Sequence, residues 1–190
     1  MTLIFATHNP NKVREIQELL PDHIQIKSLS DLNYHEEIIE DGNTIEANAA
    51  IKATKVSKLF NLPCFADDTG LEVDTLNGEP GVTSARYAGE PKDDEANKRK
   101  LLFNLKHKTD RSARFKTVIV FKDRDIEKNF TGVCEGEITA KAAGNVGFGY
   151  DPIFKPKGYS KTFAEMSASE KNKISHRSLA FQKLIAYLKA

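Results

Sequence analysis

The stretch from Cys64 to Val73 places two neighbouring carboxylates inside a sequence that is otherwise typical of a buried β-strand. An apolar lead runs into Asp67 and Asp68, a threonine and a glycine follow, and strand-like alternation then resumes. Successive side chains of a strand point to opposite faces, so the two acids cannot both face one site if the backbone is extended. We therefore expect one acid to meet a metal or a substrate and the other to bond to the backbone or to a neighbouring lobe. A polar turn between two short strands is the alternative, because Asp, Thr and Gly are ordinary turn residues.

The composition suits one large domain or two closely packed lobes. The chain has 190 residues, of which 39% are hydrophobic and 29% are charged, and it is long enough to bury a sizeable core. The net charge of +1 argues against a general nucleic-acid-binding protein, which usually carries a basic excess. The two cysteines lack metal-ligand spacing and predict buried, reduced thiols. Because there is no basic leader and no apolar run of membrane-spanning length, we expect a cytoplasmic protein without a membrane partner.

A strand, a polar loop and a helix are expected at the start of the chain. Residues Thr2 to Thr7 form a short apolar run, Asn9 is a good helix N-cap, and Pro10 fits the first helical turn. Free backbone N–H groups at the helix start, the helix dipole and Lys12 would all favour an anion, so this segment is a candidate phosphate cradle. It lacks the glycines of a Walker A motif, and a capped helix with an exposed lysine is the alternative.

The rest of the chain alternates between strand and helix patterns. Helices are expected from Thr44 to about Leu59, from Asp93 or Asp94, and from near Ser175. Strands are expected at residues 24–26, 114–121, 130–140 and 152–154. This alternation predicts an α/β protein with a mixed sheet, arranged as two lobes with a cleft.

Carboxylates and cations suited to phosphate chemistry recur along the chain. The candidate Mg²⁺ ligands are Glu40, Asp67 and Asp68. Mg²⁺ prefers hard oxygen ligands and usually rests on one or two carboxylates plus substrate phosphates. The acidic run that ends at Glu40 and Asp41 is more commonly a solvated surface, which is the alternative for that residue. The cations that could face phosphate groups are Lys12, Lys52, Lys171 and Arg177.

Residues 147–151, Gly-Phe-Gly-Tyr-Asp, present an aromatic side chain between two glycines. Phe148 could stack on a nucleotide base, or it could be a core residue as most apolar aromatic side chains are. His176 stands near the start of the last predicted helix and could be a cap, a core histidine or a group that reads a base.

Seven sequence blocks, in order and over nearly the whole chain, resemble the inosine triphosphate pyrophosphatase family. The blocks lie at residues 6–12 (Ala-Thr-His-Asn-Pro-Asn-Lys), 40–42 (Glu-Asp-Gly), 48–53, 66–71 (Ala-Asp-Asp-Thr-Gly-Leu), 80–87, 147–154 and 170–177. Each block is weak alone, whereas seven in order make a specific match. The resemblance implies a single catalytic domain over residues 1–190, with a two-lobed, elongated mixed β-sheet flanked by helices and a central substrate cleft. It also implies a homodimer.

The same resemblance implies the role of each site residue. Asp68 would be the general base and, together with Glu40, would hold Mg²⁺. Residues 7–12 would bind the triphosphate, Thr69 would contact the substrate, and a later group would complete the nucleotide site. The substrate-binding residues implied in this way are Thr7, His8, Asn9, Pro10, Asn11, Lys12, Thr69, Phe148, Gly149, Tyr150, Asp151, Lys171, His176 and Arg177.

Two positions depart from the family pattern. Ala47 stands where the family often has a glutamate, and Glu46 cannot simply replace it because one residue is about 100° of helix rotation. Thr69 stands where serine is common, which keeps the hydroxyl group.

The implied activity is Mg²⁺-dependent hydrolysis of non-standard purine nucleoside triphosphates (ITP, dITP, XTP and dXTP) to the monophosphate and pyrophosphate, which would cleanse the nucleotide pool. Asp68 would deprotonate a water that attacks the α-phosphorus, while Mg²⁺, Lys12 and backbone N–H groups would stabilise charge on the leaving pyrophosphate. Two alternatives stay open: a broader nucleoside triphosphate pyrophosphatase acting on other modified bases, and a nucleotide-binding sensor that does not hydrolyse its ligand. Purine nucleoside triphosphates are the expected partners, and nucleic acid is not.

Overall fold

The computed structural model describes residues 2–17, 19–21 and 23–189, and the chain forms two compact units. Unit 1 comprises Met1–Asp68, Thr117–Gly132 and Arg177–Ala190, and unit 2 comprises Thr69–Lys116 and Val133–His176. Three strands contribute residues to both units, namely β3 (Cys64–Val73), β5 (Ser112–Asp123) and β6 (Ile126–Ile138).

The described strands form one mixed sheet. Its order is β2-β1-β3-β5-β6-β7, and the short β4 pairs with β3. The remaining strands are β1 (Thr2–Phe5), β2 (Gln25–Ser28), β4 (Pro80–Gly81) and β7 (Phe154–Pro156). β1 runs parallel to β2 and β3, whereas β4 and β7 are antiparallel to their neighbours. The prediction of a mixed sheet flanked by helices is therefore confirmed, and the predicted cleft stays a prediction.

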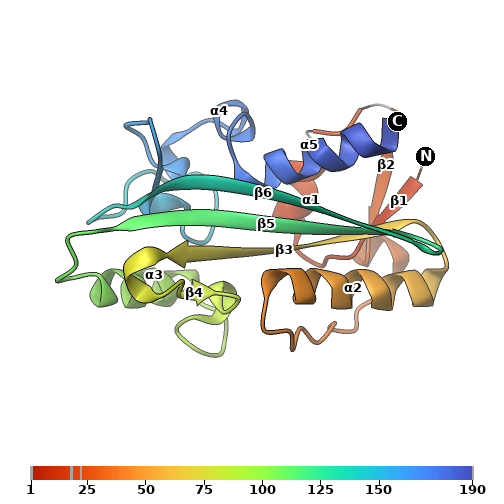
Figure 1. Cartoon of the computed structure of the whole chain (residues 1–190), viewed down its shortest axis with the longest axis horizontal. Helices are drawn as coiled ribbons and strands as arrows, with labels where there is room; N and C mark the ends of the chain where they lie inside the picture. The colour runs from red at the N-terminus through yellow and green to blue at the C-terminus, as the bar shows by residue number, and fades with distance from the viewer. Residues whose placement is uncertain (1, 18, 22, 190) are drawn as a thin grey trace. The chain divides into compact units, whose positions relative to one another are not determined.

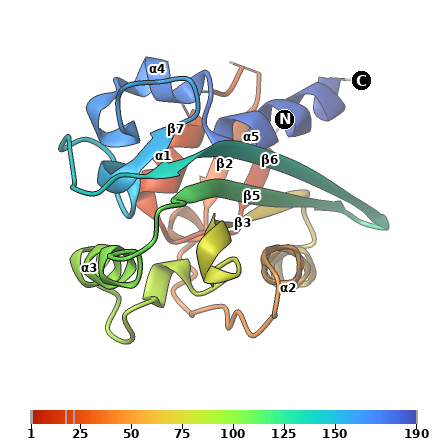
Figure 2. The ribbon, with the colours of Figure 1, turned by 60° about the vertical axis from the view of Figure 1, so that its left-hand side comes forward.

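In unit 1, helices cover both faces of the strands. The helix α2 (Ile45–Phe60) lies on one face, and α5 (His176–Lys189) lies on the opposite face (Figure 1), an arrangement that Figure 2 shows from a second direction. The core under α2 includes Ala49, Ala53 and Cys64, and the core under α5 includes Phe65 and Phe181. These two clusters place odd and even residues of β3 on different faces, as the period of a strand requires.

The first helix, α1 (Pro10–Gln17), packs with the α5 cluster of unit 1. Its Ile16 is buried in that cluster, and Val13 is partly buried against it. The predicted N-cap is confirmed, because Asn9 Oδ1 accepts hydrogen bonds from the N–H groups of Asn11 (2.9 Å) and Lys12 (3.4 Å). Carboxamide capping of this kind satisfies donors that the helix itself leaves unpaired.

Unit 2 has its own hydrophobic core. Leu71, Leu101, Phe115, Phe154 and Phe163 contribute to it. Its helices are α3 (Asp94–Asn104), whose N-cap is Asp93, and α4 (Ala168–Asn172). Short 3₁₀ helices occupy Ser30–Leu32 in unit 1 and Asp74–Leu76, Ser84–Arg86, Asp151–Ile153 and Phe163–Glu165 in unit 2.

Two expectations about strands are corrected. The residues around Asp67 form one continuous strand, so the alternative of a polar turn between two short strands is wrong. The strand expected at 152–154 begins later, at Phe154, because Asp151–Ile153 forms a 3₁₀ turn that contains Pro152 near its start. Proline has no N–H for a strand ladder and fits the first turn of a helix.

The predicted pair of long strands and the predicted thiols are both confirmed. β5 and β6 are joined by a turn at Arg124, which has a φ of 52°, and Asp125. Cys64 and Cys134 are free and buried. In the described part of the chain, no helix has both the length and the apolar character needed to cross a membrane.

Candidate active site

Asp67 and Asp68 use the two faces of β3 to meet different cations. Asp67 is 2% exposed, and its Oδ1 lies 2.9 Å from Lys12 Nζ. Asp68 Oδ1 lies 3.6 Å from Lys52 Nζ, on the face that α2 covers. Because β3 is continuous, its two faces keep the carboxylates apart. Asp67 pairs with a cation on the α1 side, and Asp68 faces a cation on the α2 side.

Lys52 bridges Asp68 and Glu40. Its ammonium lies 2.6 Å from Glu40 Oε2 and 3.6 Å from Asp68 Oδ1. Burial opposes the charge on Lys52, but the two carboxylates outweigh burial and raise its pKa. The pKa of Asp68 is also raised, chiefly because burial disfavours its ionised form, and Lys52 only partly offsets that effect. The two carboxylates therefore already converge on one positively charged group.

The loop that carries Glu40 is attached to the start of α2. Gly42 N–H donates to Asn48 Oδ1 at 2.8 Å, and Asn48 is 4% exposed. The predicted cap of this helix is confirmed, because the Thr44 hydroxyl accepts a hydrogen bond from Ala47 N–H at 3.0 Å. A side chain at Gly42 would meet Asn48 Oδ1 at 2.6 Å, so the loop and the helix approach more closely than any other residue type permits.

Glu40 and Asp68 could hold a divalent cation. They present two hard oxygen ligands toward one cationic centre, and Mg²⁺ commonly rests on one or two carboxylates with the substrate's phosphates. Among residues 2–17, 19–21 and 23–189, no group of three or more His, Cys, Asp or Glu side chains forms a complete metal cage. Asp67, the third carboxylate that the sequence offered, is engaged with Lys12 and Arg177.

The loop before α1 is organised by its own side chains. Thr7 Oγ1 accepts a hydrogen bond from Asn9 N–H at 3.1 Å, and the Asn9 carboxamide accepts from the next N–H groups of the helix. Pro10 has no N–H to offer. His8 is exposed and its ring Nε2 lies 3.1 Å from the carbonyl oxygen of Glu36. An anion at this helix start would compete with the Asn9 side chain, whose bond to Lys12 N–H is already long at 3.4 Å.

Lys12 is a largely buried cation at the beginning of α1, with a side chain that is 15% exposed. Burial lowers its pKa more than any other influence, and the neighbouring Asp67 opposes that effect. A buried ammonium group gains from a further negative charge, so this lysine suits a phosphate ligand.

Arg177 enters the same region from the first turn of α5. It is 4% exposed, its Nε lies 3.4 Å from Asp67 Oδ2, and its Nη1 donates to Glu15 of α1. Glu15 was not singled out by the sequence, because an acidic residue on a surface helix carries no signal by itself. The structure therefore places this predicted substrate-binding residue between two carboxylates.

In unit 2, Asp151 organises the predicted aromatic loop. Asp151 Oδ2 accepts hydrogen bonds from Phe148 N–H at 3.0 Å and from Lys171 Nζ at 2.9 Å. The Lys171 ammonium lies 5.3 Å from the centre of the Phe148 ring, within the range of a cation–π contact. Gly147 has a φ of 86°, and a side chain there would meet Asp151 Oδ2 at 2.1 Å, so only glycine fits. Phe148 itself is half-buried.

Two further contacts hold this loop. Gly149 N–H donates to Asp94 Oδ2 at 3.0 Å, and the Tyr150 hydroxyl donates to Ser84 O at 2.8 Å. Burial raises the pKa of Tyr150 well above its usual value. The sequence suggested Asp94 only as a helix start, and nothing local connects it to a loop 55 residues away.

The last two predicted site residues of unit 2 are His176 and Thr69. The ring of His176 is 4% exposed and stacks on Phe115, with ring centres 4.5 Å apart and planes at 16°. This packing agrees with a core histidine, and a role of His176 in reading a base stays a prediction. Thr69 is half-buried in β3, at the first residue of unit 2.

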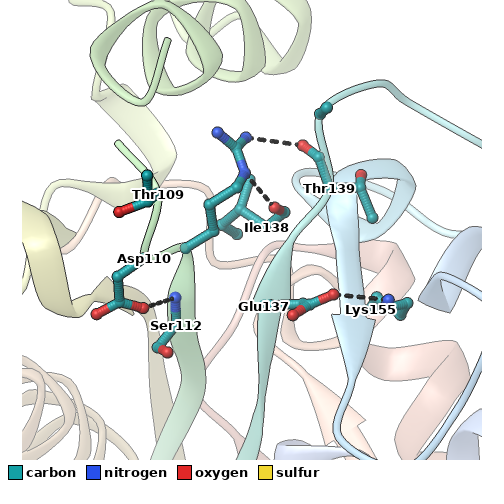
Figure 3. Close-up of a pocket in the computed structure, with 9 residues that line it drawn as sticks. Thr109, Asp110, Ser112, Glu137, Ile138, Thr139 and Lys155 are labelled. Carbon is teal, nitrogen blue, oxygen red and sulfur yellow. Dashed lines mark hydrogen bonds and ion pairs between the residues drawn. The ribbon is translucent and has the colours of Figure 1, made fainter. Parts of the chain in front are cut away.

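A pocket of about 390 Å³ in unit 2 contains none of the predicted site residues. As Figure 3 shows, it is lined by residues 109–112 and 137–140 with Lys155. Its charged groups are used internally, because Arg111 donates to the carbonyl oxygens of Ile138 and Thr139 and Lys155 pairs with Glu137 at 2.6 Å. We assign it no role in the candidate site.

The mixed α/β fold, together with two carboxylates around a buried lysine and a second lysine at a helix start, defines a candidate enzyme of phosphate chemistry. The family model described as "Ham1 family" matches residues 3–187. The chain belongs to the Ham1 family. This membership confirms the resemblance to inosine triphosphate pyrophosphatases.

Curated relatives and solved structures agree with this membership. The chain is 58% identical over 188 residues to the dITP/XTP pyrophosphatase of Christiangramia forsetii, covering 99% of each chain, and 49% identical over 191 residues to that of Bacillus subtilis, covering 98% and 96%. The structure of the Staphylococcus aureus Ham1 protein matches with a TM-score of 0.91 at 43% identity, over 100% of this chain and 98% of that one. A structure described as a nucleoside-triphosphatase and dITP/XTP pyrophosphatase from Mycobacterium abscessus matches with a TM-score of 0.80 at 40% identity, over 97% and 98%.

Proposed function

We propose that this chain hydrolyses non-standard purine nucleoside triphosphates (ITP, dITP, XTP and dXTP) to the nucleoside monophosphate and pyrophosphate, with Mg²⁺ as cofactor. The observation that carries the proposal is the convergence of Glu40 and Asp68 on one cationic centre at Lys52. The relatives named dITP/XTP pyrophosphatase, which match essentially the whole chain, supply the substrate class.

Asp68 is the proposed general base. In the reaction, a water oxygen bonds to the α-phosphorus, the bond between that phosphorus and the bridging oxygen of the leaving pyrophosphate breaks, and Asp68 takes the water proton. A carboxylate is a better base when its pKa is raised toward the working pH, and burial raises the pKa of Asp68. Glu40 and Asp68 would hold the Mg²⁺, which supplies positive charge to the phosphate oxygens and acidifies water.

Lys12 and Lys52 provide further positive charge in unit 1. Lys12 and Lys52 are both largely buried and both held by carboxylates, so their ammonium groups are fixed before the substrate arrives. Fixed cations stabilise charge that develops on a leaving pyrophosphate without reorganising at the moment of reaction. We assign the triphosphate to these groups and to the loop formed by residues 7–12.

The base end of the substrate is assigned to the loop around Phe148. Its half-buried ring offers a stacking surface, and Asp151 holds the loop by accepting hydrogen bonds from Phe148 N–H and Lys171 Nζ. Hypoxanthine and xanthine present an acceptor at O6, whereas adenine presents a donor at N6 and would leave a protein donor unpaired. Such a mismatch can reduce kcat/KM by several orders of magnitude.

A homodimer and a cytoplasmic location belong to the same proposal. Both cysteines are free and buried, which agrees with a reducing compartment. Light scattering coupled to size exclusion would measure the mass of the assembly, and a mass of one chain would reject the dimer.

The test is to quantify pyrophosphate released from ITP, XTP, ATP and GTP, with Mg²⁺ and with a chelator in its place. We expect metal-dependent pyrophosphate from ITP and XTP, far above that from ATP and GTP. Asp68→Asn should lose about 10²- to 10⁴-fold in rate, the usual contribution of a general base. Asp125→Asn, in the exposed turn after β5, is the matched control and should behave as wild type. Binding of ITP without pyrophosphate from any nucleotide would reject the hydrolase and favour a sensor.

A further inference from the structure

Four charged side chains of unit 1 form a continuous chain of ion pairs. Lys12 Nζ lies 2.9 Å from Asp67 Oδ1, Arg177 Nε lies 3.4 Å from Asp67 Oδ2, and Arg177 Nη1 donates to Glu15. We call Lys12, Asp67, Arg177 and Glu15 the four-charge chain. It connects α1 to β3, β3 to α5, and α5 back to α1, so α1 carries both of its ends.

The four-charge chain is nearly dehydrated. The side chains of Lys12, Asp67, Arg177 and Glu15 are 15%, 2%, 5% and 18% exposed, respectively. Desolvating charges is costly, and apolar side chains of similar volume are often as stable or more stable in such a place. Stability alone therefore does not explain four charges here, and the same face of β3 already shows the apolar solution two residues earlier, where Phe65 stacks on Phe5.

Glu15 is at one end of the four-charge chain and Lys12 is at the other, and the contacts between them link the two. Glu15 and Lys12 are three positions apart on α1, so they lie on one side of the helix. Arg177 donates to Glu15 through Nη1 and to Asp67 Oδ2 through Nε. The other oxygen of Asp67, Oδ1, therefore accepts the hydrogen bond from Lys12. Without Glu15, the guanidinium could turn its planar fork to both oxygens of Asp67, which is the arrangement that arginine favours with a carboxylate. Lys12 would then lose its own partner.

We propose that Glu15 is a positioning residue for the triphosphate: acting through Arg177 and Asp67, it fixes the ammonium group of Lys12 at the start of α1. The identity of the anion rests on the proposed function. Glu15 contacts no substrate in this scheme, and the effect to be tested is the one on the phosphate end.

The first measurement is the affinity for tripolyphosphate, which tests the phosphate end without a base or a chemical step. Glu15→Gln keeps the shape of the side chain and removes its charge. We expect the Kd from calorimetry to rise about tenfold, and kcat/KM for ITP to fall by a similar factor. Glu127→Gln is the matched control, because Glu127 pairs with Lys122 at 2.7 Å in the same unit but is 46% exposed. It should leave both quantities unchanged.

A double-mutant cycle separates positioning from a general structural role. Arg177→Lys keeps the charge but loses the fork that reaches two carboxylates. If Glu15 acts through Arg177, adding Glu15→Gln to Arg177→Lys should change the tripolyphosphate Kd by much less than tenfold. Glu15→Asp keeps the charge on a shorter side chain and should recover part of the tripolyphosphate affinity. If Glu15→Gln does not fold, the affinity of Glu15→Asp tests the proposal in its place.

Each outcome is decisive. The proposal would be overturned if Glu15→Gln folds and binds tripolyphosphate with unchanged affinity, even if its Tm is lower. It would also be overturned if the losses of tripolyphosphate affinity in the two single variants add fully in the double variant. Wild type that releases no pyrophosphate from any nucleotide would reject the proposed function instead, while the tripolyphosphate measurement would still decide the role of Glu15.

Discussion

Asp67 and Asp68 are consecutive residues of β3, yet their carboxylates lie on opposite faces of the strand. Asp67 is paired with Lys12 and Arg177, which belong to α1 and α5, whereas Asp68 faces Lys52 of α2. The pKa values move in opposite directions. Burial alone would raise the pKa of Asp67, but Lys12 and Arg177 outweigh it and lower the value to about 2, whereas burial keeps the pKa of Asp68 raised. Two residues that are neighbours in sequence thus have different cation partners and opposite pKa shifts, because they lie on opposite faces of one strand.

Asp67→Asn should destabilise the protein at pH 7 and lose that effect in acid. The pKa of Asp67 is lowered from 3.8 to about 2 in the folded state, so its contribution to stability is present above pH 3.8 and is lost as the pH falls toward 2. We expect a pH-dependent part of about 2 kcal/mol. Urea unfolding of both proteins between pH 7 and pH 2 measures it. A difference in unfolding free energy that does not narrow as the pH falls from 3.8 toward 2 would contradict the prediction.

Lys52→Met should bind a divalent cation more tightly in the absence of nucleotide. Lys52 now neutralises Glu40 and Asp68, and its removal leaves two carboxylates facing each other without a cation. We expect the Kd for Mn²⁺, measured by electron paramagnetic resonance, to fall about tenfold, because a nearby like charge is removed. Hydrolysis should fall at the same time, since Lys52 is also assigned to the phosphates. Weaker or unchanged Mn²⁺ binding would show that these carboxylates do not hold the metal.

Gly147→Ala should raise the KM for ITP more than Gly158→Ala. The two glycines have nearly the same φ, 86° and 85°, so both substitutions carry similar backbone strain. A methyl group at 147 would also meet Asp151 Oδ2 at 2.1 Å, whereas nothing lies within 4 Å at 158. Because Asp151 holds Phe148 and Lys171, we expect about a tenfold rise in KM from the first substitution alone. Equal KM values in the two variants would argue against a role for this loop in binding the base.

Asn48→Ala should raise the Mg²⁺ concentration needed for half-maximal activity. Asn48 Oδ1 accepts the Gly42 N–H and thereby holds the loop that carries Glu40. Thr44→Ala removes the N-cap of the same helix and is the matched control for stability. Each variant should lose about 1 kcal/mol of unfolding free energy. Only Asn48→Ala should change the Mg²⁺ dependence by severalfold, and a shift of the same size in Thr44→Ala would point to a general loss of order in α2.

Local signals in the sequence were sufficient to predict most of the helices and strands. The caps at Asn9 and Thr44, the start of α3 after Asp93, and the long β5–β6 pair depend on capping chemistry and hydrophobic period over a few residues, and all of them are present. The same short-range patterns gave the blocks by which the chain resembles its family, and the family membership is confirmed.

The tertiary structure alone decided which side chains meet. Glu15 and Arg177 are 162 residues apart in sequence, and Asp94 and Gly149 are 55 apart, so no local pattern connects either pair. Whether residues around Asp67 form a turn or a strand was likewise open, because Asp, Thr and Gly favour turns until neighbouring strands supply hydrogen bonds and helices supply cations. The sequence determined the residue types and the period of each element. The packing of α1, α2 and α5 on β3 determined which carboxylate each cation would hold, because an ion pair exists only where the fold brings both charges within a few ångströms.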